Sequence, residues 1–139
     1  MTKQYSGLES LFKKYKSDGL RVLAFPANNF ANQEPGSNAE IKKFCTSKYD
    51  VTFDLFAKVS VKGDDQCDLY RYLTTHPDKA IAGKVKWNFQ KYLVGRDGVV
   101  IAKFGPTTKP ESKKIVKAIE EALAAKVPDE PGDEEARPT

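Results

Sequence analysis

The stretch Leu20-Arg-Val-Leu-Ala-Phe-Pro26, which continues as Ala-Asn-Asn-Phe-Ala-Asn-Gln-Glu-Pro-Gly-Ser-Asn up to residue 38, decides the fold of this chain. The consecutive apolar residues at 22–25 predict a short buried strand, and Pro26 ends it because proline has no N–H to donate to a ladder. The polar loop that follows leads to Ser37 and Glu40, whose spacing is that of a helix capping box.

A strand that leads through a polar loop into a helix is where open α/β sheets place their sites. Gln33 and its neighbours are therefore the first candidates for function. Residue types alone favour a simpler interpretation, in which the loop is only a long and well-capped connection.

The composition indicates one globular domain of ordinary character. The chain has 139 residues, 40% hydrophobic and 30% charged, which suffices for one core. No apolar run is long enough to span a bilayer, and no signal-like apolar segment opens the chain, so we expect a cytoplasmic protein without a membrane span. Two cysteines and one histidine are too few for a disulfide scaffold or a zinc site, and no cofactor is expected.

Charge is distributed unevenly along the sequence. The net charge is +4, and residues 128–139 carry five acids and one base, so the remaining chain is strongly basic. We expect a domain over residues 1–126 and a disordered acidic tail over 127–139, since the tail has almost nothing apolar to bury. The lysines form no run interleaved with aromatic residues, so no nucleic-acid partner is expected. The basicity weakly favours anionic small molecules or acidic proteins, although a solvated surface is the simpler explanation.

The periodicity of apolar residues predicts an alternation of helices and strands. Residues 5–15 have helical spacing, and a second helix over Asn38–Tyr49 would bury Ile41, Phe44 and Cys45. We expect Pro110 to open the last helix. The other expected elements are strands at 20–25 and 59–61, a short helix near 69–73, a strand over 87–94, a turn at 95–98 and a return strand over 99–104.

Four side chains invite a chemical interpretation. Cys45 is either a buried inert thiol or a redox thiol, and Cys67 lies among acids that raise a thiol pKa, which favours a bystander. Trp87 is either core or an indole N–H donor to a negatively charged sulfur. Asn88 follows it on an expected strand and should then point to the opposite face, unless the strand begins there.

Several motifs in order resemble the glutathione peroxidase family. The resemblance covers about residues 4–123 and is carried by Phe25-Pro26, Gln33-Glu-Pro-Gly-Ser-Asn38, Lys86-Trp-Asn-Phe89 and Lys91-Tyr-Leu-Val-Gly-Arg-Asp-Gly98. It implies a thioredoxin-like α/β fold and a monomeric peroxidase that acts on hydrogen peroxide and organic hydroperoxides. Glutathione or thioredoxin would be the reductant, and the short loop over 74–83 resembles the monomeric members, which often use thioredoxin.

The resemblance also implies roles for particular residues. The motifs place Gln33, Trp87 and Asn88 as helpers of the reacting sulfur, and Cys45 at the position of the resolving cysteine of the disulfide-forming members. The chain departs from the family at Ala27 and Asn29, where the family has cysteine and glutamine, and this departure affects little.

The more serious departure is at the start of the sequence. The family's peroxidatic cysteine or selenocysteine ends a strand that precedes the first helix, and this chain starts at Met1 just after that point. We therefore expect a thioredoxin-like fold that lacks its first central strand, an N-terminally shortened peroxidase and low stability, since two strand edges would stay unpaired. The alternatives are a non-catalytic redox or binding module, or an inactive truncation product.

Overall fold

The computed structural model describes residues 3–30 and 36–125, and it has the α/β order expected from the sequence. The elements are α1 (Gln4–Tyr15), the 3-10 helix η1 (Lys16–Asp18), β1 (Leu23–Ala24), α2 (Asn38–Tyr49), β2 (Asp54–Leu55), α3 (Asp68–Thr74), β3 (Lys91–Val94), β4 (Val100–Phe104) and α4 (Lys113–Ala124). The expected tail over 127–139 lies outside the described residues.

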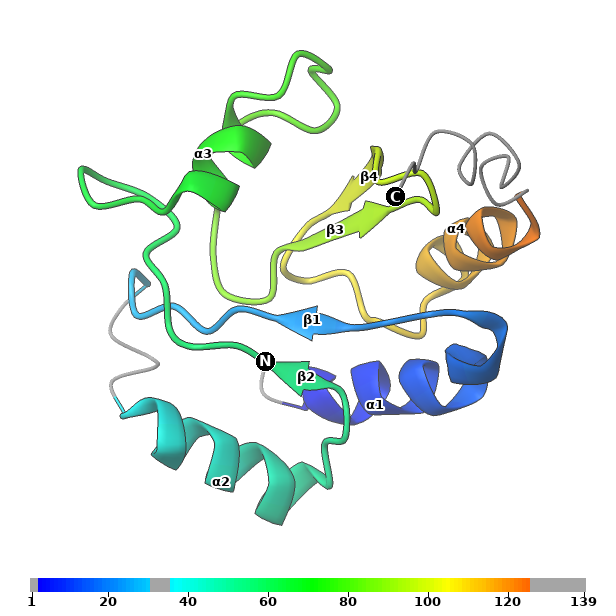
Figure 1. Ribbon diagram of the computed structural model, residues 1–139, viewed down its shortest axis with the longest axis horizontal. Coiled ribbons are helices and arrows are strands. Elements are labelled where there is room, and N and C mark those ends of the chain that lie inside the picture. Colours follow the sequence, from blue (N-terminus) through cyan, green and yellow to red (C-terminus); the bar gives the residue numbers. More distant parts are fainter. Residues whose placement is uncertain (1–2, 31–35, 126–139) are drawn as a thin grey trace, which may run out of the picture.

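The strands form two separate two-stranded sheets. β1 pairs in parallel with β2, and β3 pairs antiparallel with β4 across the predicted turn, where the N–H of Gly95 donates to the Val99 carbonyl. In Figure 1, β1 and β3 are the neighbouring strands of the two sheets, and they run in opposite directions. Within the described ranges no strand lies between them.

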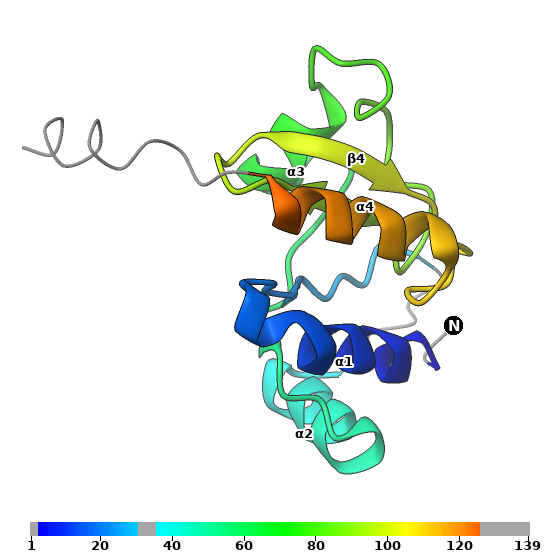
Figure 2. The same ribbon diagram turned by 90° about the vertical axis from the view of Figure 1, so that its right-hand side faces the viewer.

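The helices cover the two sheets from different sides. α1 lies between α2 and α4 in the turned view (Figure 2), and it contributes to two apolar clusters. Leu11 and Tyr15 pack with Ile115 and Ile119 of α4, while the cluster shared with α2 contains Tyr5, Phe12, Ile41, Cys45, Val51 and Phe53. This helix is thus the common support of both sheets.

A buried carboxylate of α1 binds the segment that precedes β2. Glu9 is only 5% exposed, and it accepts hydrogen bonds from the Thr52 N–H at 2.7 Å and the Thr52 hydroxyl at 2.5 Å. Lys13, one turn further along α1, lies 3.8 Å from the same carboxylate. A buried charge is tolerated only with such partners, so this contact fixes the position of α1 relative to the segment around Thr52.

The structure corrects expectations about the strands, the exposure of Phe44 and the start of α4. β1 and β3 are shorter than predicted, and residues 59–61 form no strand because their backbone groups bond to scattered partners, Pro26, Cys67 and the Asn29 side chain. Phe44 is 41% exposed rather than on the inner face of α2, since it packs on Tyr49 at the surface. Ser112, not Pro110, caps α4, because its hydroxyl accepts the Ile115 N–H.

Candidate functional site

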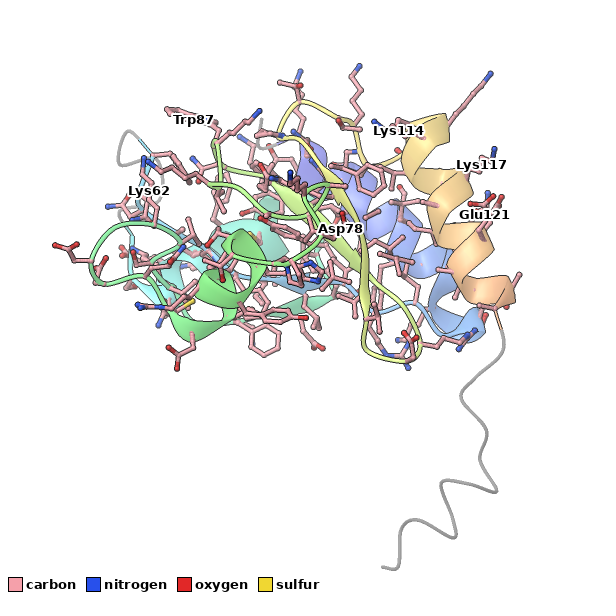
Figure 3. All side chains as sticks on the ribbon, turned by 90° about the horizontal axis from the view of Figure 1, so that it is seen from above. Lys62, Asp78, Trp87, Lys114, Lys117 and Glu121 are labelled. Atoms are coloured by element: carbon pink, nitrogen blue, oxygen red, sulfur yellow. The ribbon has the colours of Figure 1, made fainter. Side chains whose placement is uncertain are left out.

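Trp87 is half-buried on one side of the molecule, where it packs against residues from three loops. Its ring lies 5.4 Å from that of Phe30, and the ammonium of Lys62 lies 4.7 Å above the same Phe30 ring. Figure 3 shows Trp87 and Lys62 on this side. The cluster also contains Ala27, Val61 and Val85. Packing thus holds the indole in place.

Asn29 holds the loop that carries Phe30. Its amide oxygen accepts the Val61 N–H at 2.9 Å, and its amide nitrogen donates to the Ser60 hydroxyl at 3.1 Å. The side chain therefore ties residues 27–30 to the loop over 59–62, which fixes one wall beside Trp87. In the sequence Asn29 stands out only as a departure from the family pattern, and no local signal indicates this structural role.

Trp87 and Asn88 do not lie on opposite faces of a strand, contrary to expectation. β3 begins only at Lys91, and Phe89 has φ +68°, a backbone conformation that bulky residues rarely adopt. This turn changes the direction of the chain between the Trp87-Asn88 pair and the strand. Both side chains line the same cavity as a result.

The Lys91 side chain stabilises the unusual backbone conformation of Phe89. Its ammonium donates to the carbonyl oxygen of Phe89 at 2.7 Å and lies 3.5 Å from those of Gly105 and Pro106. Burial lowers the pKa of Lys91 to about 8. Sequence reasoning did not find Lys91, because in the expected strand over 87–94 it was one alternating residue among others.

The cavity itself lies between β1 and β3. Its volume is about 1080 Å³, and residues 19–27 and 87–96 line it along both strands. The charged residues in its lining are all basic, namely Arg21, Lys91 and Arg96. The basic side chains and the indole and amide N–H donors of this lining favour a thiolate or another anion over a neutral group.

The structure brings together only part of the sulfur site predicted from the sequence. Trp87 and Asn88 line one cavity, but Cys45 does not. Cys45 is fully buried among the residues shared by α1 and α2, and it is not part of the cavity lining. Cys67 is half-buried at the start of α3, and neither thiol is in a disulfide. Gln33 lies outside the described residues.

Neither a metal-ligand cluster nor a membrane-spanning helix is found in the described part of the chain. No group of three His, Cys, Asp or Glu side chains in residues 3–30 and 36–125 could hold a metal ion. No helix in these ranges has the length and apolar character needed to cross a membrane.

Comparison with known proteins gives a consistent result. The family model described as glutathione peroxidase matches residues 1–74. A glutathione peroxidase of Lactococcus lactis is 48% identical over 110 residues, which cover 79% of this chain and 70% of that protein. The glutathione peroxidase-like peroxiredoxin gpx1 of Schizosaccharomyces pombe is 46% identical over 110 residues, again 79% of this chain and 70% of the relative.

Solved structures agree with these relatives. The crystal structure of Trgpx in apo form matches with a TM-score of 0.69 and 38% identity, over 91% of this chain and 74% of that chain. The T. cruzi GPX1 structure matches with a TM-score of 0.63 and 29% identity, over 88% and 72%. The order of elements, the motifs and these relatives together show that the chain belongs to the glutathione peroxidase family and has its thioredoxin-like α/β fold.

Proposed function

We propose that this chain supplies the supporting part of a thiol-dependent peroxidase that reduces hydrogen peroxide and organic hydroperoxides in the oxidative-stress response. The observation that carries the proposal is the shared cavity: Trp87 and Asn88 both line it, beside three basic residues and, among the described residues, no carboxylate. We further propose a cytoplasmic monomer that takes electrons from thioredoxin or glutathione.

The reaction needs a thiolate. The thiolate attacks one peroxide oxygen, the O–O bond breaks, and the sulfur is oxidised to a sulfenic acid while the other oxygen takes a proton and leaves as water or an alcohol. The Trp87 indole N–H and the amides of Asn88 and Gln33 are donors for the thiolate and for the developing oxyanion. Donors held by packing stabilise this charge without reorganisation.

The attacking sulfur is proposed to come from outside the 139 residues. Cys45 is fully buried, and neither Cys45 nor Cys67, at the start of α3, is part of the cavity lining. A fully buried thiol is a poor nucleophile.

Cys45 is proposed as the resolving thiol. Its sulfur would displace the hydroxyl of the sulfenic acid as water and form a disulfide, which the reductant then cleaves by thiol exchange. Because Cys45 is fully buried, this step requires movement of α2, whose other buried residue is Ile41. Short, mostly exposed helices open at low free energy, so such movement is accessible.

The test is a peroxide-consumption assay coupled to thioredoxin and its reductase. The 139-residue chain should show no activity above background. A chain extended ahead of Met1 by the corresponding segment of the Lactococcus lactis relative should reduce peroxide. In that extended chain Trp87→Phe should lower kcat/KM by roughly a hundredfold, the lower end of the usual effect of losing one oxyanion donor.

The control for this assay is Val99→Ala, at a side chain that is 51% exposed and is not part of the cavity lining, which should leave kcat/KM unchanged. Cys45→Ser in the extended chain should still form a sulfenic acid that reacts with dimedone, but turnover with thioredoxin should stop. Undiminished turnover of Cys45→Ser would refute its resolving role, and an inactive extended chain that folds would refute the proposed function.

A further inference from the structure

The turn between Trp87 and β3 has a backbone conformation that needs support from outside the turn. β3 begins at Lys91, which pairs with Phe104, the last residue of β4, so the two chains lie side by side at this end of the sheet. Just ahead of the sheet, Phe89 has φ +68°. A bulky residue adopts this conformation rarely, and it persists only where the surrounding structure holds it.

The ammonium group of Lys91 provides this support. A lysine ammonium has three N–H donors and no acceptor, and here three carbonyl oxygens surround it. The carbonyl oxygen of Phe89 lies at 2.7 Å, and those of Gly105 and Pro106, in the segment that leaves β4, lie at 3.5 Å. One side chain thus joins the turn to the neighbouring segment. We call this arrangement of Lys91 and the three carbonyl groups the Lys91 clamp.

The Lys91 clamp is connected to the first turn of α1. The side-chain amide nitrogen of Gln4 donates to the carbonyl oxygen of Pro106 at 2.8 Å. The ring of Phe89 packs edge-on against the ring of Tyr5, at 5.1 Å between centroids. The turn is therefore held through its backbone by Lys91 and through its ring by α1.

The neighbouring side chains do not replace Lys91 in this role. Gln90 lies between Phe89 and Lys91, yet its side-chain amide atoms are buried and make no hydrogen bond within the described residues. Trp87 packs against Phe30 and other apolar side chains, which hold its ring but not the backbone after it. The direction in which the chain continues from Trp87 thus depends on the Lys91 clamp.

The charge of Lys91 is unfavourable for the stability of the fold. Burial lowers the pKa of Lys91 to about 8, because the surroundings disfavour the charged form, although the amine remains charged at pH 7. Methionine has a similar length and would avoid the burial of a charge. Groups that cost stability are found most often where function requires them. The Lys91 clamp is such a group, and its effect is on the geometry of the turn.

We propose that Lys91 is a positioning residue of the peroxidase site, which directs the N–H donors of Trp87 and Asn88 toward one reacting sulfur. The inference rests on the proposed function. Donors that are already oriented stabilise the charge on the leaving oxygen while the thiolate attacks and the O–O bond breaks. Exchange of the later disulfide with the reductant involves no peroxide oxygen. Lys91 should therefore affect the peroxide step and not the reductant step.

The first experiment uses NMR of the 139-residue chain labelled with ¹⁵N, at pH 7 and low temperature. Trp87 is the only tryptophan, so its indole N–H gives one signal, and the side-chain amide signals of Asn88 are assigned by their loss in Asn88→Ala. Lys91→Met should shift the signals of both residues, since it removes all three donors. Lys91→Arg keeps a charged donor and should leave the signals nearer their original positions.

The matched control is Lys103→Met, on the neighbouring strand β4. Lys103 is also half-buried, and its ammonium donates to the carbonyl oxygen of Ala82 at 2.8 Å, but it does not line the cavity. This variant should leave the signals of Trp87 and Asn88 in place. Equal shifts in Lys103→Met and Lys91→Met would overturn the proposal, and so would the absence of any shift in Lys91→Met. Circular dichroism checks that each variant keeps its secondary structure.

A double-mutant cycle tests whether Lys91 acts through the backbone of Phe89. Glycine adopts a positive φ without strain, so in a Phe89→Gly background the turn no longer depends on Lys91. Lys91→Met should then shift the Asn88 signals less than it does in the original chain. Equal shifts in the two backgrounds would contradict the proposed route from Lys91 to Asn88.

The second experiment uses the extended chain and measures its two substrates separately. Lys91→Met should lower kcat/KM for the peroxide roughly tenfold, as for the loss of a hydrogen bond from a charged group, and Lys91→Arg should recover part of this loss. The value of kcat/KM for thioredoxin should stay within about twofold. An equal loss for both substrates would show a general structural effect and overturn the positioning role. An extended chain that folds but is inactive would refute the proposed function, whereas unmoved NMR signals in Lys91→Met would refute the Lys91 clamp itself.

Discussion

At the scale of single residues, Phe89 and Lys91 determine how the candidate site is built. A bulky residue at φ +68° costs about 1–3 kcal/mol, and it persists only where its surroundings hold it. Here the Lys91 ammonium binds the Phe89 carbonyl, and the Phe89 ring packs at 5.1 Å against the edge of Tyr5. This held conformation brings Trp87 and Asn88 to one cavity.

Lys91 also predicts a pH dependence of stability. Burial lowers its pKa from 10.5 to about 8, so between these values the folded chain binds fewer protons than the unfolded chain. The destabilising effect of the buried charge is complete below about pH 8, and stability should rise as the pH increases toward 10.5. Tyr70 and Tyr92, whose pKa values burial raises, oppose this rise only above about pH 10.

The measurement is the urea midpoint at several values from pH 7 to 9.5. Lys91→Met should lose the upward slope that the original chain shows over this range. The control Lys117→Met, at an exposed lysine of α4, should keep that slope. Parallel slopes for the original chain and Lys91→Met would show that Lys91 does not titrate there.

At the scale of elements, α2 depends on its cap. Only Ile41 and Cys45 of its residues are buried, whereas Ser37 and Glu40 form the predicted capping box with hydrogen bonds of 3.1 and 2.8 Å. The hydrogen bonds from Ser37 hold the pKa of Glu40 below its usual value. With so little packing, the local hydrogen bonds carry a large part of the stability of this helix.

Ser37→Ala should therefore lower the free energy of unfolding by about 1 kcal/mol, as typical for loss of an N-cap. Ser112→Ala is the matched control at the start of α4. Its hydroxyl accepts only a long bond of 3.4 Å, and Ile115 cannot bond back, so its loss should cost less. Urea unfolding of both variants decides this, and a larger effect of Ser112→Ala would contradict the assignment.

The strands show why element length depends on partners. Residues 20–25 have the composition of a six-residue strand, but only Leu23 and Ala24 are paired as β1, because β2 offers just two residues. A strand is defined by its ladder, and a ladder needs a partner of equal length. Residue types alone therefore gave the place of β1 but not its extent.

At the scale of the whole molecule, the cavity between β1 and β3 divides the apolar interior. Four buried clusters are spread around it, and the largest fully buried side chains in the described chain are Ile81 and Cys45. A cavity of about 1080 Å³ lies at or above the upper end of the usual size of ligand pockets, which is about 1,000 Å³. Apolar surface that stays hydrated there contributes nothing to stability.

The 139-residue chain should accordingly be poorly stable. We expect a thermal midpoint below about 45 °C, under the usual range of mesophilic domains, and binding of the dye ANS to the exposed apolar surface. Calorimetry and dye fluorescence measure both. A cooperative transition with a midpoint inside the range of about 45–65 °C would contradict this expectation.

The sequence by itself determined the α/β order, the exact span of α2 with its capping box, the hairpin turn and the family, because these follow from local periodicity, turn chemistry and motifs. The tertiary structure alone decided that Asn88 lines the same cavity as Trp87, that Phe44 faces outward and that Cys45 is buried outside the cavity lining. Each of these depends on which strand edges find partners and on a backbone turn held by the distant contacts of Lys91, and neither is encoded in the pattern of neighbouring residues.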